Sequence, residues 1–179
     1  MRIDLAIDEF LNYCTFEKGL ADKTKISYKN DLDVYKEYLN ELNITNVDKI
    51  KSDNIKDFIK EREQDASTTI AHNLTVIKNF HSYLLKEKIV SKDVSEFIER
   101  PKLKKSLPKT LSIEDVDCLL DIELNTPFDY RNKAMLELIY GCGLRISELI
   151  NLEINDIDEI NCFIRILGKG SKEREIPVS

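Results

Sequence analysis

The chain has 179 residues, of which 42% are hydrophobic and 34% charged, enough for one good-sized domain or two small ones. No run approaches the roughly 18 consecutive apolar residues that a membrane span needs, and the first ten residues mix acids with apolar residues, which argues against a secretory signal. We therefore expect a cytoplasmic protein without a membrane partner. The net charge of −6 argues against a nucleic-acid binder, but salt screens net charge over about 10 Å, so the local placing of lysines and arginines matters more.

The cysteines show no pattern of a metal site or a disulfide framework. Cys14, Cys118, Cys142 and Cys162 form no C-x-x-C pair and have no histidine at ligand spacing. Reduced, partly buried thiols are therefore expected, with no metal and no cofactor.

Apolar residues at steps of three or four predict four helices in the first hundred residues. Gly19 interrupts the pattern after the first helix, Asp22 and Ser52 are expected to cap the second and third, and Ser67 to open the fourth. Residues 1–99 are thus expected to form a compact helical bundle, whose aromatic side chains lie in the core rather than serve as stacking platforms. The four apolar stripes are Ile3, Ile7, Phe10 and Cys14; Tyr28, Leu32, Tyr35, Leu39 and Leu42; Ile55, Phe58 and Ile59; and Ile70, Leu74, Ile77, Phe80 and Leu84.

Residues 100–110 are predicted to be an extended basic linker. The run RPKLKKSLPK at 100–109 holds two prolines and no acid, and proline restricts both itself and the residue before it. Two interpretations stay open: a plain hinge, or a strap that contacts phosphates in an otherwise acidic chain. In the second, the DNA contacts are Arg100, Lys102, Lys104, Lys105 and Lys109.

Helical patterns return in residues 111–179. Ser112 with Asp115 three residues later resembles a capping box that opens a short helix. Pro127 precedes another helix, whose apolar side is Ala134, Leu138 and Ile139, and a further helix is expected to run from Leu144 through Leu149.

The end of the chain has the period of two that is typical of strands. Cys162, Ile164 and Ile166 alternate with Phe163, Arg165 and Leu167, and Ile176 and Val178 alternate after a turn at Gly168-Lys169-Gly170. This pattern predicts a β-hairpin. The stretch Leu152–Ile157 is expected to add a short first strand, giving a small antiparallel sheet.

Arg145 is a candidate phosphate ligand. It follows a G-x-G step at a helix start, and its planar guanidinium can grip two phosphate oxygens. Glu148 lies three residues on, on the same face, and could hold the arginine in place. Taken alone, the pair is equally an ordinary exposed ion pair at a helix start.

Lys169 is the second candidate. It stands between two glycines at the expected hairpin tip, where the backbone can approach a ligand closely. A solubilising turn lysine is the alternative. Arg165, Lys172 and Arg174 add positive charge to the same hairpin, which could enter a DNA groove or lie in solvent.

Two segments together, GCGLRISEL at 141–149 and LGKGSKEREIPV at 167–178, place that lysine 24 residues after Arg145. The pair closely resembles the tyrosine recombinase (phage integrase) family, especially its Xer-like branch. The resemblance implies a mainly α fold: a SAM-like core-binding bundle, a basic linker, and an α+β catalytic domain whose first part is residues 111–179. Further segments resemble the family's bundle and its crossing into the catalytic domain: 24–39, 75–87 and 101–120.

The resemblance also implies roles for matching positions. Arg145 would clamp the scissile phosphate and stabilise the charge on its oxygens, Glu148 would support Arg145, and Lys169 would act as general acid toward the departing 5′ oxygen. A tyrosine would attack the phosphate and form a 3′-phosphotyrosyl link, so that the bond energy is kept without ATP, and arginines rather than a metal would neutralise the phosphate. The implied partners are double-stranded DNA and other recombinase protomers in a tetrameric synapse.

The chain departs from the family pattern in its later part. Neither His72 nor His81 begins an H-x-x-R box, and no tyrosine follows Lys169, since Tyr130 and Tyr140 lie before the arginine. His72 also stands where similar proteins often carry a DNA-contacting arginine.

We therefore expect a recombinase fragment that lacks its nucleophile and cannot by itself cleave DNA covalently. A non-catalytic DNA-binding or regulatory module derived from a recombinase is the alternative, and a helical protein-interaction domain is a third, weaker interpretation. The reading frame beyond Ser179 separates the first two: an H-x-x-R box and a tyrosine there would restore the enzyme.

Overall fold

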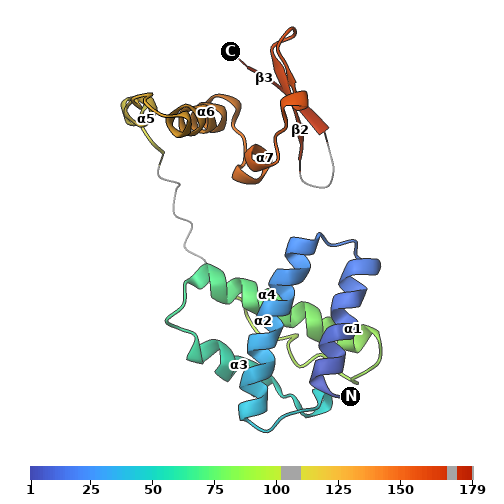
Figure 1. Cartoon of the computed structure of the whole chain (residues 1–179). Coiled ribbons are helices and arrows are strands. Elements are labelled where there is room, and N and C mark those ends of the chain that lie inside the picture. Colours follow the sequence, from blue (N-terminus) through green and yellow to red (C-terminus); the bar gives the residue numbers. More distant parts are fainter. Residues whose placement is uncertain (102–109, 169–172, 179) are drawn as a thin grey trace. The chain divides into compact units, whose positions relative to one another are not determined.

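The computed structural model describes residues 1–101, 110–168 and 173–178 (Figure 1). The chain divides into two compact units, Met1–Ser106 and Leu107–Ser179. Each unit has its own hydrophobic core. The predicted fold class is confirmed: the described residues are mostly helical, with a small antiparallel sheet near the end of the chain.

Within residues 1–101, the first unit is a bundle of four main helices, as the spacing of apolar residues predicts. Helix α2 packs against the other three and runs through the middle of the bundle (Figure 1). The predicted stripes supply the core; only Leu42, at the C-terminal cap of α2, is substantially exposed. The bounds are α1 Ile3–Phe16, α2 Asp22–Glu41, α3 Ser52–Glu61 and α4 Ser67–Lys86, with a 3-10 turn η1 at Val47–Lys49.

Aromatic side chains from different helices pack against one another in the core of this bundle. Phe10 lies edge-on to Phe80, with ring centroids 5.6 Å apart, and is stacked on Tyr28 at 6.2 Å. Tyr35 meets Phe58 edge-on at 5.2 Å. These rings are core residues, as predicted, and the offset and edge-on arrangements add to the free energy gained by burial.

Two of the predicted helix N-caps are wrong. Asp22 and Ser52 are the first helical residues rather than caps, because the extended residues that precede the helices are Ala21 and Lys51. In α3 the cap interaction comes from Asn54, whose side-chain oxygen accepts the Lys51 N–H at 2.8 Å. Helix α4 does begin at Ser67, as expected.

Two histidines of the bundle lie in different environments. His81 is 1% exposed, its Nε2 lies 3.4 Å from the Tyr35 hydroxyl, and burial lowers its pKa to about 4. His72 is half-exposed, and its Nε2 lies 3.1 Å from an Asp31 carboxylate oxygen and 3.2 Å from the Ser27 hydroxyl. The first is a neutral core histidine, and the second belongs to a surface polar cluster between α2 and α4.

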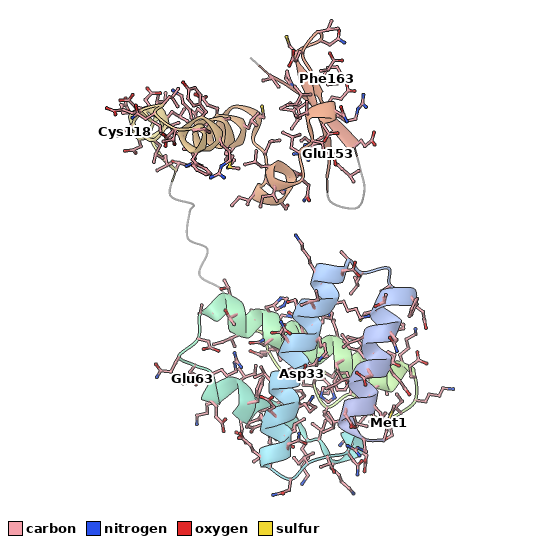
Figure 2. All side chains as sticks on the ribbon, viewed as in Figure 1. Met1, Asp33, Glu63, Cys118, Glu153 and Phe163 are labelled. Atoms are coloured by element: carbon pink, nitrogen blue, oxygen red, sulfur yellow. The ribbon has the colours of Figure 1, made fainter. Side chains whose placement is uncertain are left out.

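The second unit begins with short helices and ends in a sheet. Ser112 and Asp115 form the predicted capping box, with bonds of 3.1 and 3.0 Å, and Pro127 is the first residue of its helix. Figure 2 labels Cys118 on the first of these helices, where the thiol is exposed. The bounds are α5 Ile113–Leu120, α6 Pro127–Cys142, α7 Ile146–Ile150, a 3-10 turn η2 Ile154–Asp156, β1 Ile157–Asp158, β2 Phe163–Leu167 and β3 Glu173–Pro177.

Among the described residues, the sheet has three antiparallel strands in the order β1-β2-β3. The predicted antiparallel pairing of the last two strands is confirmed, with Ile164 opposite Ile176 and Ile166 opposite Arg174; Lys169 and Gly170 of the predicted turn lie outside the described residues. The predicted first strand is wrong over most of its length. The Glu153 N–H donates to the Asp156 carboxylate at 2.9 Å, and this bond fixes a 3-10 turn where a strand was expected.

The second core is small. Leu144, Ile164 and Ile166 are its fully buried members, and half-buried residues such as Leu138 pack against them. Helix α6 has no fully buried residue. On its predicted apolar side, Leu138 and Ile139 are half-buried, but Ala134 is exposed.

Two further findings concern the described residues. Within residues 1–101, 110–168 and 173–178, no helix combines the length and apolar character needed to cross a bilayer. Histidine, cysteine and acidic side chains of these same residues form no group able to hold a metal ion.

Candidate phosphate and nucleic-acid site

The backbone around Arg145 explains how its side chain is presented. Helix α6 ends at Cys142, and Gly143 takes the left-handed conformation (φ 60°, ψ 34°) that favours glycine. Leu144 is buried and anchors the turn. Arg145 is extended and is the N-cap residue of α7, so this helix begins two residues later than predicted.

Helix α7 has only five residues. Its dipole can therefore contribute little to anion binding, and the Arg145 guanidinium is the candidate anion ligand. The Arg145 side chain is 67% exposed, so its remaining N–H donors are accessible to a ligand.

Glu148 is the buried centre of the site. Its side chain is 5% exposed, and each carboxylate oxygen accepts two hydrogen bonds. Oε1 accepts from Arg145 Nη1 and Arg174 Nη1, both at 2.8 Å. Oε2 accepts from the Arg145 backbone N–H at 2.8 Å and from Arg174 Nη2 at 2.9 Å. The carboxylate thus has two guanidinium partners, as a buried charge requires.

These partners lower the pKa of Glu148 from 4.5 to about 2. The largest cause is the hydrogen bonding of Arg174, followed by the Arg145 backbone N–H. Glu148 is therefore ionised at neutral pH, and it is bonded to both the backbone and the side chain of Arg145 at the start of α7.

The pairing of Arg174 with Glu148 is a contact that the sequence did not reveal. Both Nη atoms of Arg174 are bonded to the Glu148 carboxylate, and the DNA contact predicted for Arg174 stays a prediction. A signal was present: Arg174 shares a period of two with Ile176 of the same strand and with Val178 just beyond it, and both of these residues pack against the core. An arginine at such a position needs a buried partner.

Two other candidate residues lie among the described ones. Arg165 lies on β2 with its side chain 53% exposed and 3.9 Å from Glu175 on the neighbouring strand. Arg100 is exposed at the end of the first unit's described residues. The remaining candidates lie outside the described residues: Lys102, Lys104, Lys105, Lys109, Lys169 and Lys172.

The described residues form a mainly helical protein of two units, and in the second unit the buried Glu148 carboxylate holds the exposed side chain of Arg145. Two sequence families match this chain. Residues 7–88 match the phage integrase N-terminal SAM-like domain, and residues 109–179 match the phage integrase family. The chain belongs to the phage integrase family, that of the tyrosine recombinases.

Similar proteins are longer than this chain. The tyrosine recombinase XerD of Oceanobacillus iheyensis is 43% identical over 179 residues, which cover 98% of this chain and 60% of the relative. XerD of Staphylococcus epidermidis is 38% identical over 175 residues, covering 96% and 59%. The chain therefore spans about three fifths of the length of these relatives.

Solved structures share the fold at low sequence identity. A lambda integrase tetramer bound to a Holliday junction matches with a TM-score of 0.79 and 14% identity, over 99% of this chain and 51% of the other. The XerH recombinase bound to palindromic difH substrate matches with a TM-score of 0.68 and 20% identity, over 95% and 52%.

Proposed function

We propose that this chain acts in site-specific DNA recombination, as part of a tyrosine recombinase that cleaves and rejoins DNA through a 3′-phosphotyrosine. The observation that carries the proposal is Glu148: a buried carboxylate fixes Arg145 through two hydrogen bonds and leaves most of its guanidinium exposed. The XerD relatives are tyrosine recombinases by name, and the lambda integrase and XerH structures contain DNA, which supports the same function.

Arg145 has the chemistry to hold a scissile phosphate. Its planar fork can donate two parallel hydrogen bonds to non-bridging oxygens, and its fixed charge stabilises the charge that accumulates on them in the transition state. Glu148 supplies the orientation. Lys169 is proposed as the general acid for the departing 5′ oxygen; the nucleophilic tyrosine has no counterpart after Lys169 in these 179 residues.

The proposed partners are double-stranded DNA and further recombinase protomers, since the lambda integrase neighbour is a tetramer on a Holliday junction. In this proposal residues 1–99 form the core-binding domain, 100–110 the linker along the duplex, and 111–179 the first part of the catalytic domain. DNA contacts come from the basic linker and from Arg165 on the hairpin, and the cytoplasm is the proposed location.

Binding measured over a range of salt concentrations tests this proposal. Because phosphate contacts release counterions, the logarithm of the DNA affinity should fall linearly with the logarithm of the salt concentration, with a slope of about −0.9 per contact. Fluorescence anisotropy with a labelled mixed-sequence duplex measures it. An affinity that does not change with salt would contradict the set of contacts.

A second candidate is a non-catalytic DNA-binding or regulatory module. Among these 179 residues, Tyr130 and Tyr140 lie on α6 and the other five tyrosines lie in the helical unit. A nicked suicide duplex separates cleavage from binding. The 179-residue chain should retard this DNA in a native gel and leave no covalent adduct in a denaturing gel; an adduct would rule out the second candidate.

A further inference from the structure

We propose that Arg174 is a positioning residue for Arg145: it neutralises and orients the Glu148 carboxylate, so that Arg145 keeps most of its guanidinium free for a DNA phosphate. The inference rests on the proposed function of Arg145 as the phosphate ligand. It gives Arg174, on β3, a different role from the direct DNA contact expected of a hairpin arginine.

The two arginines bond to the Glu148 carboxylate in different ways. Arg174 spans both carboxylate oxygens with Nη1 and Nη2, at 2.8 and 2.9 Å, which is the bidentate geometry that guanidinium and carboxylate prefer. Arg145 bonds to the same carboxylate with only one side-chain nitrogen, Nη1, besides its backbone N–H. Its Nε and Nη2 have no partner among the residues that the structure describes.

The charge balance gives the second reason. Glu148 is buried, and an unpaired buried carboxylate is strongly unfavourable. With Arg145 as its only guanidinium partner, the pair would carry no net charge. Adding Arg174, also positive, leaves the group of three at a net charge of +1, which suits an anionic ligand. Arg174 is also the first cause of the low pKa of Glu148.

The position of Arg174 in the sheet links two parts of the site. It lies opposite Ile166 of β2, a core residue that is 3% exposed, and its partner Glu148 lies on α7. The ion pair therefore connects β3 to the start of α7, where Arg145 lies. In the sequence, the segment between β2 and β3 contains Lys169. Moving β3 would move the Glu148 carboxylate and, with it, the Arg145 side chain.

A double-mutant cycle on DNA affinity tests whether Arg174 acts through Glu148. Arg174→Met should weaken binding about tenfold in the wild-type background but less than about threefold in Glu148→Gln, because the carboxylate through which it acts is then absent. Arg165→Met is the matched comparison on the neighbouring strand, and it should cause the same loss in both backgrounds. Equal losses for Arg174→Met in the two backgrounds would overturn the proposal in favour of a direct DNA contact.

Arg174→Lys separates geometry from charge. Lysine keeps the positive charge but cannot span both carboxylate oxygens, so it should not restore the affinity lost in Arg174→Met. Full restoration would mean that charge alone suffices, and would overturn the positioning role.

A measurement without DNA keeps this test independent of the proposed function. Carboxyl-carbon NMR should show Glu148 titrating near pH 2 in the wild type and in Arg165→Met, and at a higher pH in Arg174→Met and Arg174→Lys. Arg145 guanidinium N–H signals should broaden in the same two Arg174 variants. If the wild type bound no DNA, the proposed function would fail while these signals still reported on Arg174; an unchanged Glu148 titration in both variants would overturn the inference.

Discussion

The two units hold their polar side chains in opposite ways. In the helical unit, a large apolar core drawn from α1 to α4 encloses His81, which is kept neutral by burial. In the second unit the fully buried core is Leu144, Ile164 and Ile166 among the described residues, yet beside it lies Glu148, a buried residue kept charged by two arginines.

This difference indicates what each unit is suited for. Burial of apolar side chains stabilises the bundle without requiring directional contacts. It is sufficient to hold the bundle together because the core is extensive. In the proposed function, Arg145 must present its donors to a phosphate in one orientation. The directional hydrogen bonds around Glu148 can provide that orientation where the core is small. We therefore expect the two units to respond to different perturbations.

The largest expected effect is a cavity in the first core. Leu74 is 0% exposed in α4, and Leu74→Ala should lower the free energy of unfolding of the helical unit by about 3 kcal/mol. Hydrogen exchange resolved by residue measures it in each unit separately. Leu85→Ala, at a 41% exposed position of the same helix, should cost about 0.5 kcal/mol or less. An equal loss of protection in the second unit would show that the two units unfold together.

Acid should destabilise the helical unit through His81. Its pKa in the folded state is about 4, below the ordinary 6.5, so the unfolded chain takes up the proton first. The stability that this group contributes is fully present above pH 6.5 and is lost as the pH falls to 4, by about 3 kcal/mol. Urea unfolding at a series of pH values should show the loss in the wild type and in His72→Gln, but not in His81→Gln.

In the second unit the acid-sensitive group is Glu148, and it loses its contribution to stability over a lower pH range than His81 does. Its folded pKa of about 2 lies below 4.5, so its contribution is present above pH 4.5 and is lost as the pH falls toward 2. We expect a smaller change than for His81, because the partner arginines are 67% and 37% exposed and water screens them. In Glu148→Gln, the protection of the hairpin amides from hydrogen exchange should no longer fall between pH 4.5 and 2. If the protection still fell as in the wild type, the acid sensitivity would belong to other carboxyl groups.

The smallest expected effect is weak self-association through exposed apolar residues of the second unit. Tyr140 on α6 is 58% exposed, and Ile146 and Ile150 on α7 are 69% and 72% exposed. Ile150→Lys should reduce any concentration-dependent rise in mass seen by analytical ultracentrifugation. A wild-type chain that stays monomeric at high concentration would argue against this surface.

Local patterns predicted much of the molecule. The apolar stripes of the four bundle helices, the Ser112–Asp115 capping box and the hairpin all follow from periods and turn residues that lie within a few positions of one another. The pairing of Arg145 with Glu148 was predictable for the same reason, since both lie on one turn.

The sequence was less informative where the outcome depends on distant or competing contacts. Arg174 is 26 residues from Glu148, and its pairing depends on how the hairpin packs against α7, which no local pattern records. The stretch Leu152–Ile157 is apolar enough for a strand, but the side chain of Asp156 captures the Glu153 N–H and turns the backbone. Domain boundaries at 99 and 110 and the roles of the linker lysines stay predictions.

The most direct test of the account compares two arginines of the second unit in DNA binding. Arg145→Gln removes the proposed phosphate ligand, whereas Arg131→Gln removes the same charge from an exposed position of α6, where the side chain contacts Asn132 and the Phe128 ring. We predict that Arg145→Gln weakens affinity about tenfold and reduces the salt slope by about one, while Arg131→Gln has a much smaller effect. Equal, small losses in the two variants would contradict a phosphate site at Arg145.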